Sequence, residues 1–321
     1  MLENQVIEYI RQRALRASQT GIRLGIGDDT AILKPVRSDQ ESLLTTDQVI
    51  ENTHFLREQH PPEALGWKCL ARGLSDIAAM GGEPGHFLLS LGLPAWALEN
   101  VWLKQFLSGM FQLSTFARTT LIGGDVARAE RFTAHVAVTG SVPVGLALRR
   151  DKARAGDTVY VSGELGGSAL GFERLGFEHL GSNSVGCNSS GAGDPAVERH
   201  LRPQPRLDLG RYLRKTARAT AAIDLSDGLS TDVRRVAQAS GVGIEIDESA
   251  VPRFGDASTK QALHGGEEYE LLFTARSLTA IPKKRNGLRL TPIGRVVARR
   301  GVYVIFSGKR RPLKPEGFEH F

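Results

Sequence analysis

Residues 223–229, Ile-Asp-Leu-Ser-Asp-Gly-Leu, place two aspartates in a turn between an apolar run and an amphipathic segment. The apolar residues around Ala222 are typical of a buried strand, and residues 229–240 have the spacing of a helix. A strand that ends in a polar turn and leads into a helix is a building unit of α/β proteins. This stretch therefore predicts an α/β fold whose strand-end turns carry the chemistry.

Turns of this kind recur along the chain. They are Gly25-Ile26-Gly27-Asp28-Asp29, Thr45-Thr46-Asp47 and Gly123-Gly124-Asp125, with Ser75-Asp76 on an expected helix. Taken alone, each aspartate is typical of an ordinary turn or helix cap. Several carboxylates brought together repel one another unless a cation lies among them, and Mg²⁺ combines such oxygen ligands with water and phosphate oxygens. The set predicts a magnesium site that serves a phosphate-bearing substrate.

The length of 321 residues, with 41% hydrophobic and 24% charged residues, fits two domains of ordinary size. The first half predicts strands around residues 42–46, 87–91, 120 and 136, and helices over 62–80 and 98–117. The second half predicts strands near residues 159, 222, 244 and 272, and helices from 168 and over 229–240. A polar segment at 149–157 separates two strand-like runs, so the predicted domains are residues 1–148 and 149–321. The Gly- and Ser-rich segment 181–195 is expected to be a mobile loop.

Composition excludes several classes of protein. The most apolar stretch, Phe87–Leu98, is shorter than the ~18 residues of a membrane span and contains Gly92 and Pro94. Residues 1–15 resemble an amphipathic helix and lack the apolar core of a signal peptide. The two cysteines, Cys69 and Cys187, match no metal or disulfide spacing. We therefore expect a soluble, cytoplasmic protein with no membrane partner.

The net charge of +6 and the pI of 9.5 raise the question of nucleic acid. The basic residues cluster late, at Lys283–Arg285, Arg299-Arg300 and Lys309–Arg311, and no aromatic residues alternate with them. This pattern favours a solvated surface or the attraction of small anions over a nucleic-acid groove. A non-catalytic protein that binds nucleic acid through these segments is the competing class, and steep salt dependence would identify it.

The common nucleotide-binding signatures are missing, since the chain has neither a P-loop nor the motifs of protein kinases. One glycine-rich turn, Ser162-Gly163 to Gly166-Gly167, lies between an expected strand and an expected helix. It could hold a phosphate, or it could be a plain glycine turn.

Eight motifs together resemble those of the bacterial thiamine-monophosphate kinases. They are GIGDD (25–29), TTD (45–47), NTHF (52–55), LSDIAAMGG (74–82), LIGGD (121–125), IDLSDGL (223–229), HGGEEYEL (264–271) and GFEHF (317–321). The resemblance runs in order from about residue 3 to residue 321. The Gly-Gly-Glu-x-Tyr-Glu segment and the C-terminal ending point to this branch of the superfamily named after aminoimidazole ribonucleotide synthetase.

The resemblance implies a two-domain α/β fold whose N-terminal domains pair into a β-barrel across a homodimer. It also implies Mg²⁺-dependent transfer of a phosphoryl group from ATP to thiamine monophosphate, giving ADP and thiamine diphosphate. The transfer is expected to be direct, with no nucleophilic side chain.

The resemblance also assigns roles to individual residues. The metal ligands would be Asp29, Thr45, Thr46, Asp47, Asp76, Asp125, Asp224 and Asp227. Gly124, Asp125, Arg150 and Ser226 would contact ATP. His54, Glu267 and Phe318 would face thiamine monophosphate.

Three positions depart from the family pattern. Glu268 replaces an aspartate, Leu146 stands where an arginine is usual and leaves Arg149 or Arg150 for the nucleotide, and the terminal aromatic corresponds to Phe318 or, by counting from the end, to Pro315. Other interpretations of these residues also remain. Asp76 could pair with Arg72, Asp227 could cap the helix from Leu229, and another enzyme of the superfamily could carry the same motifs. A selenophosphate synthetase would need Cys or selenocysteine within residues 19–30, which contain none.

Overall fold

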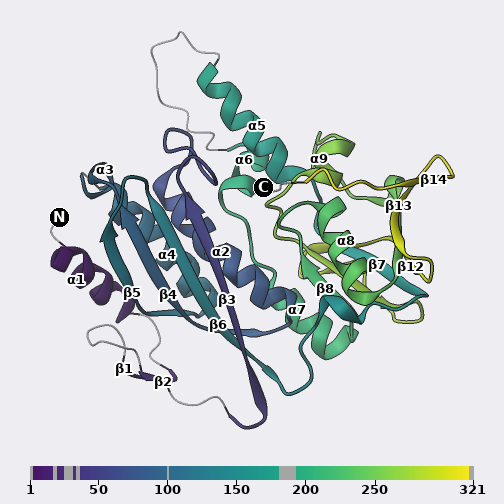
Figure 1. Cartoon of the computed structure of the whole chain (residues 1–321), viewed down its shortest axis with the longest axis horizontal. Coiled ribbons are helices and arrows are strands. Elements are labelled where there is room, and N and C mark those ends of the chain that lie inside the picture. Colours follow the sequence, from purple (N-terminus) through teal and green to yellow (C-terminus); the bar gives the residue numbers. More distant parts are fainter. Residues whose placement is uncertain are drawn as a thin grey trace. The chain divides into compact units, whose positions relative to one another are not determined.

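The computed structural model describes residues 3–16, 20–24, 32–33, 37–99, 101–180 and 193–317. The chain forms two compact units, Met1–Ile77 with Gly82–Leu146, and Ala78–Gly81 with Ala147–Phe321 (Figure 1). Asp29, Phe318 and most of the segment expected to be a mobile loop lie outside the described residues. Among the helices that are described, none is long and apolar enough to cross a membrane.

The first unit is built on a four-stranded sheet. Its strands, in spatial order, are β3 (Gln40–Ile50), β6 (Thr133–Pro143), β4 (Glu83–Leu93) and β5 (Thr120–Arg128). Strand β6 is antiparallel to both neighbours, whereas β4 and β5 are parallel. A parallel pair needs a crossover connection, and α3 (Ala95–Leu98) and α4 (Trp102–Ala117) supply it. The unit also contains α1 (Glu3–Ala14) and the short pair β1 (Ile22–Leu24) and β2 (Ile32–Leu33).

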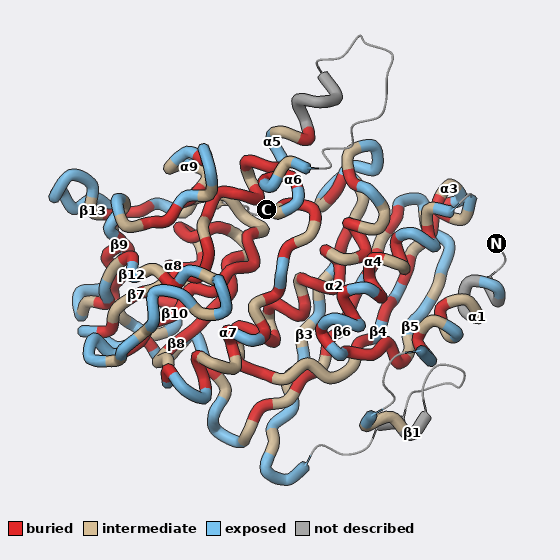
Figure 2. Tube along the Cα trace, turned by 180° about the vertical axis from the view of Figure 1, so that it is seen from behind, coloured by how far each residue is buried: buried red, intermediate tan, exposed pale blue. Residues whose placement is uncertain are grey.

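Helices α2 (Pro62–Ala79) and α4 cover one face of this sheet (Figure 1). The two helices touch through glycines: a Cβ at Gly66 would lie 1.8 Å from the carbonyl oxygen of Phe106, and one at Gly109 would lie 1.8 Å from that of Glu63. Alternate residues of β4 are buried beneath the helices, but Leu88, on the opposite face, is 42% exposed. The buried positions run in red along the strands and helices in Figure 2.

The second unit contains an eight-stranded mixed sheet. Its order is β14 (Lys309–Pro312), β13 (Gly301–Phe306), β9 (Gly243–Asp247), β12 (Leu288–Val297), β7 (Asp157–Ser162), β10 (Leu271–Arg276) and β8 (Ala221–Asp224), with β11 (Lys284–Arg285) paired to β12. The helices are α5 (Gly167–Leu180), α6 (Pro195–Leu201), α7 (Leu207–Tyr212), α8 (Leu229–Ser240) and α9 (Thr259–His264).

Both faces of this sheet are covered by a core. Residues such as Val161 and Ile223 join α8 and α9 in one hydrophobic cluster. Their strand neighbours Ala222 and Phe273 join Leu209 and Leu213, from α7 and the helical turn after it, in another. Successive strand residues point to opposite faces, so the unit has three layers. This arrangement buries β8 and leaves its last residue, Asp224, at the start of the 224–228 turn.

Candidate active site

Strand β3 and helix α2 bring together three of the predicted metal ligands. The Thr45 hydroxyl donates a hydrogen bond to the Asp76 carboxylate. Two residues farther along the same strand face, Asp47 Oδ1 lies 3.5 Å from Arg72 Nε, also on α2. Thr46 points differently, and its hydroxyl donates to the carbonyl of Val136 at 3.1 Å. Asp76 and Arg72 therefore both reach across from the helix to the strand.

Gly124 and Asp125 lie on β5, which is three strands away from β3. In the register of the sheet, Asp47 pairs with Val136, Val136 with Leu89, and Leu89 with Gly124. At ~4.8 Å per strand this line spans roughly 14 Å. Within one chain, a single ion cannot touch both Asp47 and Asp125. The glycine at position 124 also has a structural explanation, because a Cβ there would lie 1.8 Å from the Leu89 carbonyl oxygen.

The turn after β8 runs beside the segment that precedes β10. The Leu225 amide donates to the Glu270 carbonyl at 2.8 Å, and the Tyr269 amide donates to the Leu225 carbonyl at 2.9 Å. The Glu267 amide donates to the Ser226 carbonyl at 2.7 Å. A Cβ at Gly266 would lie 2.8 Å from that same carbonyl oxygen, so the close approach requires glycine. Ser226, predicted for ATP, and Glu267, predicted for the acceptor, are thus direct neighbours.

Asp227 does not cap helix α8, whose N-cap residue is Gly228 with no side-chain bond. Its carboxylate lies 2.5 Å from Arg235, which also lies 2.6 Å from Asp232. Asp232 in turn accepts the Asp227 amide at 3.0 Å, and burial raises the pKa of Asp232 to about 6. The turn therefore carries a charged side chain, Asp227, and two residues of α8, Asp232 and Arg235, hold it in place.

The C-terminal segment reaches the same turn. A Cβ at Gly317 would lie 1.9 Å from the Asp227 carbonyl oxygen, so only glycine fits there. Gly317 immediately precedes Phe318, whereas Pro315 lies two residues earlier.

The two candidate arginines differ in their partners. Arg149 makes a two-point contact with Asp151, with Nη2 to Oδ2 at 2.6 Å. The exposed side chain of Arg150 makes no hydrogen bond or ion pair in the described part of the chain. Its carbonyl accepts from Ser240, at the far end of α8 from Ser226. Twelve helical residues span about 18 Å, so Arg150 and Ser226 could touch only opposite ends of one nucleotide.

His54 lies in the turn that follows β3. Its Nδ1 accepts the Ile50 amide at 3.1 Å, so a neutral ring carries its proton on Nε2. The Nε2 atom itself is buried.

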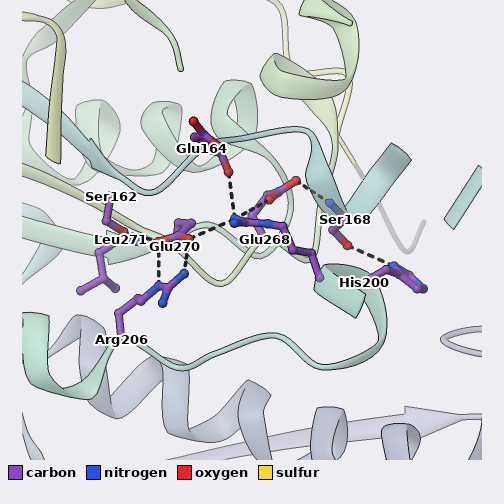
Figure 3. A network of polar contacts seen from close by, with 9 residues as sticks. Ser162, Glu164, Ser168, His200, Arg206, Glu268, Glu270 and Leu271 are labelled. Carbon is purple, nitrogen blue, oxygen red and sulfur yellow. Dashed lines mark hydrogen bonds and ion pairs between the residues drawn. The ribbon is translucent and has the colours of Figure 1, made fainter. Parts of the chain in front are cut away.

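A buried polar network, which motif reasoning missed, surrounds Glu268 and Glu270 (Figure 3). Glu270 is fully buried and binds Arg206, Arg199 and the Ser162 hydroxyl. Burial alone would raise its pKa, but the Arg206 and Arg199 charges and the Ser162 hydrogen bond hold that pKa below its usual value. The signal was present in the sequence as three glutamates within residues 267–270, because a carboxylate next to a buried strand needs a cationic partner.

The glycine-rich turn at 163–167 serves this network. A Cβ at Gly163 would lie 2.2 Å from Glu270 Oε1, and one at Gly167 would lie 2.8 Å from Arg199 Cδ. The Ser168 amide, at the start of α5, donates to Glu268 Oε1 at 3.1 Å. The helix N-terminus is thus already satisfied by an internal carboxylate, and the plain glycine turn is the better interpretation.

The predicted metal ligands all present oxygen atoms, the donor type that Mg²⁺ binds. Over the described ranges, no three His, Cys, Asp or Glu side chains gather closely enough to hold an ion by themselves. What a single chain does bring together is a pair of oxygen ligands, such as Thr45 and Asp76. Such pairs fit an ion that completes its coordination with water and phosphate.

Comparison with known proteins identifies the family. Two family models match, "AIR synthase related protein, N-terminal domain" over residues 27–142 and "AIR synthase related protein, C-terminal domain" over residues 154–307. The thiamine-monophosphate kinase of Escherichia coli (strain K12) is 36% identical over 321 residues, covering 96% of this chain and 94% of that protein. The chain belongs to the thiamine-monophosphate kinase family.

Solved structures of thiamine-monophosphate kinases share the fold. The enzyme from Stenotrophomonas maltophilia K279a is 36% identical, with a TM-score of 0.79 over 97% of this chain and 98% of that one. AaThiL complexed with AMPPCP and TMP is 35% identical, with a TM-score of 0.75 over 99% of this chain and 97% of that one. The two-domain α/β fold expected from the sequence is thereby confirmed.

Proposed function

We propose that this chain is a thiamine-monophosphate kinase, which transfers the γ-phosphoryl group of ATP directly to thiamine monophosphate. One observation carries the proposal beyond family membership. The Glu267 amide donates to the Ser226 carbonyl at 2.7 Å, so the residue assigned to the acceptor adjoins the turn assigned to ATP. Phosphoryl transfer depends mainly on holding donor and acceptor together, and this pairing supplies such a meeting point.

The acceptor chemistry fits the two residues assigned to it. Thiamine carries a cationic thiazolium ring, which a carboxylate such as Glu267 attracts. Its phosphate is an anion, to which the His54 imidazole could donate a hydrogen bond. We include Phe318 as the third acceptor residue, as the resemblance of the C-terminal motif implies.

The magnesium ligands in this proposal are all oxygen donors. They are Asp29, Thr45, Thr46, Asp47, Asp76, Asp125, Asp224 and Asp227. Bound Mg²⁺ would neutralise the charge that develops on the transferred phosphoryl group. The residues themselves orient the phosphates, and Arg150 and Ser226 hold the two ends of the nucleotide. No side chain is needed as a nucleophile.

We also propose that the functional form is a homodimer in which the first units close their sheets into a barrel. Strand β3 carries Leu44 on the face away from α2, where it is 78% exposed, and Leu88 lies on the same face. Large exposed apolar side chains on one sheet face are typical of an interaction surface. A second copy could also supply, at a sheet edge, the Asp125 that one chain holds roughly 14 Å away from Asp47.

The test is to incubate the protein with Mg-ATP and thiamine monophosphate and to look for thiamine diphosphate and ADP in equal amounts. Thiamine without its phosphate should not react, and chelation of Mg²⁺ should stop the reaction. Release of ADP without thiamine diphosphate would instead indicate another branch of the superfamily.

A further inference from the structure

The segment Glu267–Glu270 has an unusual backbone. Glu267 and Tyr269 have φ values of +60° and +51°, in the left-handed region that favours glycine. A non-glycine residue is strained in this region and persists there only where its surroundings enforce it. Glu268 and Glu270, which alternate with them, are buried, whereas the Glu267 side chain is 27% exposed. The segment thus buries two carboxylates and leaves the third partly exposed.

The inward carboxylates meet cations from the chain around α6. Glu270 receives Arg206 Nε at 2.8 Å, Arg199 Nη2 at 3.0 Å and the Ser162 hydroxyl at 2.5 Å. Glu268 Oε2 lies 3.6 Å from the same Arg199 nitrogen. Among the described cations, Arg199 alone lies within 4 Å of both glutamates.

Arg199 is itself firmly placed. Its Nη2 also donates to the Glu164 carbonyl at 2.9 Å, and its guanidinium carbon lies 4.8 Å from the centre of the Phe254 ring. The neighbouring residue on α6, His200, has Nδ1 3.7 Å from Glu267 Oε2 and 3.0 Å from the Ser168 hydroxyl. Helix α6 thus contacts all three glutamates through two consecutive residues.

We propose that Arg199 is a positioning residue for the acceptor: by holding Glu268 and Glu270, it fixes the left-handed backbone that directs Glu267 toward thiamine monophosphate. The inference rests on the proposed function, in which Glu267 is an acceptor-side carboxylate. Because the Glu267 amide is bound to Ser226, the same grip sets the distance between the acceptor and the ATP-side turn.

The first experiment compares Arg199→Gln with Arg174→Gln. In the Arg199 variant, Glu270 keeps Arg206 and Ser162, so the unit should still fold. Arg174 is the matched control, since it joins α5 to Asp194 and Asp256 without touching residues 267–270. Misplacing a contact group by about 1 Å can cost up to ~100-fold, so we expect the KM for thiamine monophosphate to rise roughly ten- to hundredfold in Arg199→Gln. The KM for ATP should stay within about twofold, and Arg174→Gln should change neither constant.

A double-mutant cycle tests the route of the effect. If Arg199 acts through Glu268, then Glu268→Gln should reproduce part of the rise, and the double variant should be much less than multiplicative. Equal increases in both KM values, or fully multiplicative effects, would overturn the proposal. A partial recovery in Arg199→Lys, which keeps the charge, would support it.

Hydrogen exchange separates this inference from the proposed function. The amides of Glu267 and Tyr269 are bound to the neighbouring turn, so Arg199→Gln should accelerate their exchange while Arg174→Gln should not. Unchanged exchange overturns the positioning role whether or not the protein has kinase activity. If Arg199→Gln accelerates this exchange but the wild type shows no kinase activity, the positioning role stands and only the proposed kinase function is rejected.

Discussion

Glu268 stands where the resemblance implies an aspartate, and its side chain has a defined partner in the structure. Its longer side chain reaches the Ser168 amide at the start of α5. Burial raises the pKa of Glu268 to about 7, although Arg199 and the Ser168 amide act against that shift. The carboxylate therefore changes charge close to neutral pH, inside the folded protein.

This residue predicts a pH dependence of stability. Between pH ~4.5 and ~7 the folded chain keeps a proton on Glu268 that the unfolded chain has released, so stability falls as pH rises through that window and levels off above it. Between pH 5 and pH 8 the free energy of unfolding, measured with urea, should fall by a few kcal/mol more in wild type than in Glu268→Gln. The expected slope is ~1.4 kcal/mol per pH unit. The contribution of Asp232 is common to both proteins and cancels. Parallel curves for the two proteins would contradict the assignment.

A second residue-scale prediction separates the two substrates. If Glu267 faces the thiazolium, as proposed, Glu267→Gln removes an attracting charge and should raise the KM for thiamine monophosphate far more than that for ATP. Arg150→Ala should do the reverse. Arg149→Ala is the control, because that guanidinium is already bound to Asp151. Steady-state kinetics with each substrate varied in turn decides the matter, and equal effects on both substrates would reject the two-sided site.

At the scale of elements, helices α2 and α4 are held together by backbone contact. Gly66 and Gly109 face the carbonyls of the partner helix so closely that no Cβ fits. The close approach buries Leu70, Leu74 and Met110 completely. It also fixes Arg72 and Asp76 of α2 against Thr45 and Asp47 of β3, so the site depends on this packing.

Gly109→Ala should therefore force the helices apart. Overpacking of this kind costs ~1–3 kcal/mol, which should lower the urea midpoint with little change in slope. Ser108→Ala, on the neighbouring half-buried position of α4, should leave the midpoint nearly unchanged. A Gly109→Ala protein as stable as wild type would show that the helices can separate without cost.

At the scale of the whole molecule, the proposed dimer rests on the exposed face of the first unit. Leu44→Asp introduces a charge on that face and should convert dimers to monomers, as measured by light scattering after size exclusion. Activity should fall with it if the partner completes the site. Leu278→Asp is the control, since Leu278 is 97% exposed in the second unit. A monomeric wild type would end the dimer proposal.

Much of the fold could be predicted from local patterns. Helix α2, expected over 62–80, spans Pro62–Ala79, and the expected helix from Leu229 to Ser240 is α8. Their periodicity and end signals lie within a few turns of chain, so they can be recognised without the rest of the molecule. Other elements escaped. Helices α6 and α7 have seven and six residues, too few for a clear period, and the basic run Lys309–Arg311 lies within strand β14.

The candidate site divides in the same way. Its acidic turns were visible in the sequence because each one is a local signal of Asp beside Gly, Ser or Thr. The partners of the buried glutamates were not visible, since Arg199 lies 71 positions from Glu270, and Ser162 lies 108. Such contacts depend on how strands and helices fold back on one another, which no local pattern encodes. The sequence by itself thus determined the family, the elements and the reactive residue types, whereas tertiary structure alone decided which carboxylates are buried and which one is presented.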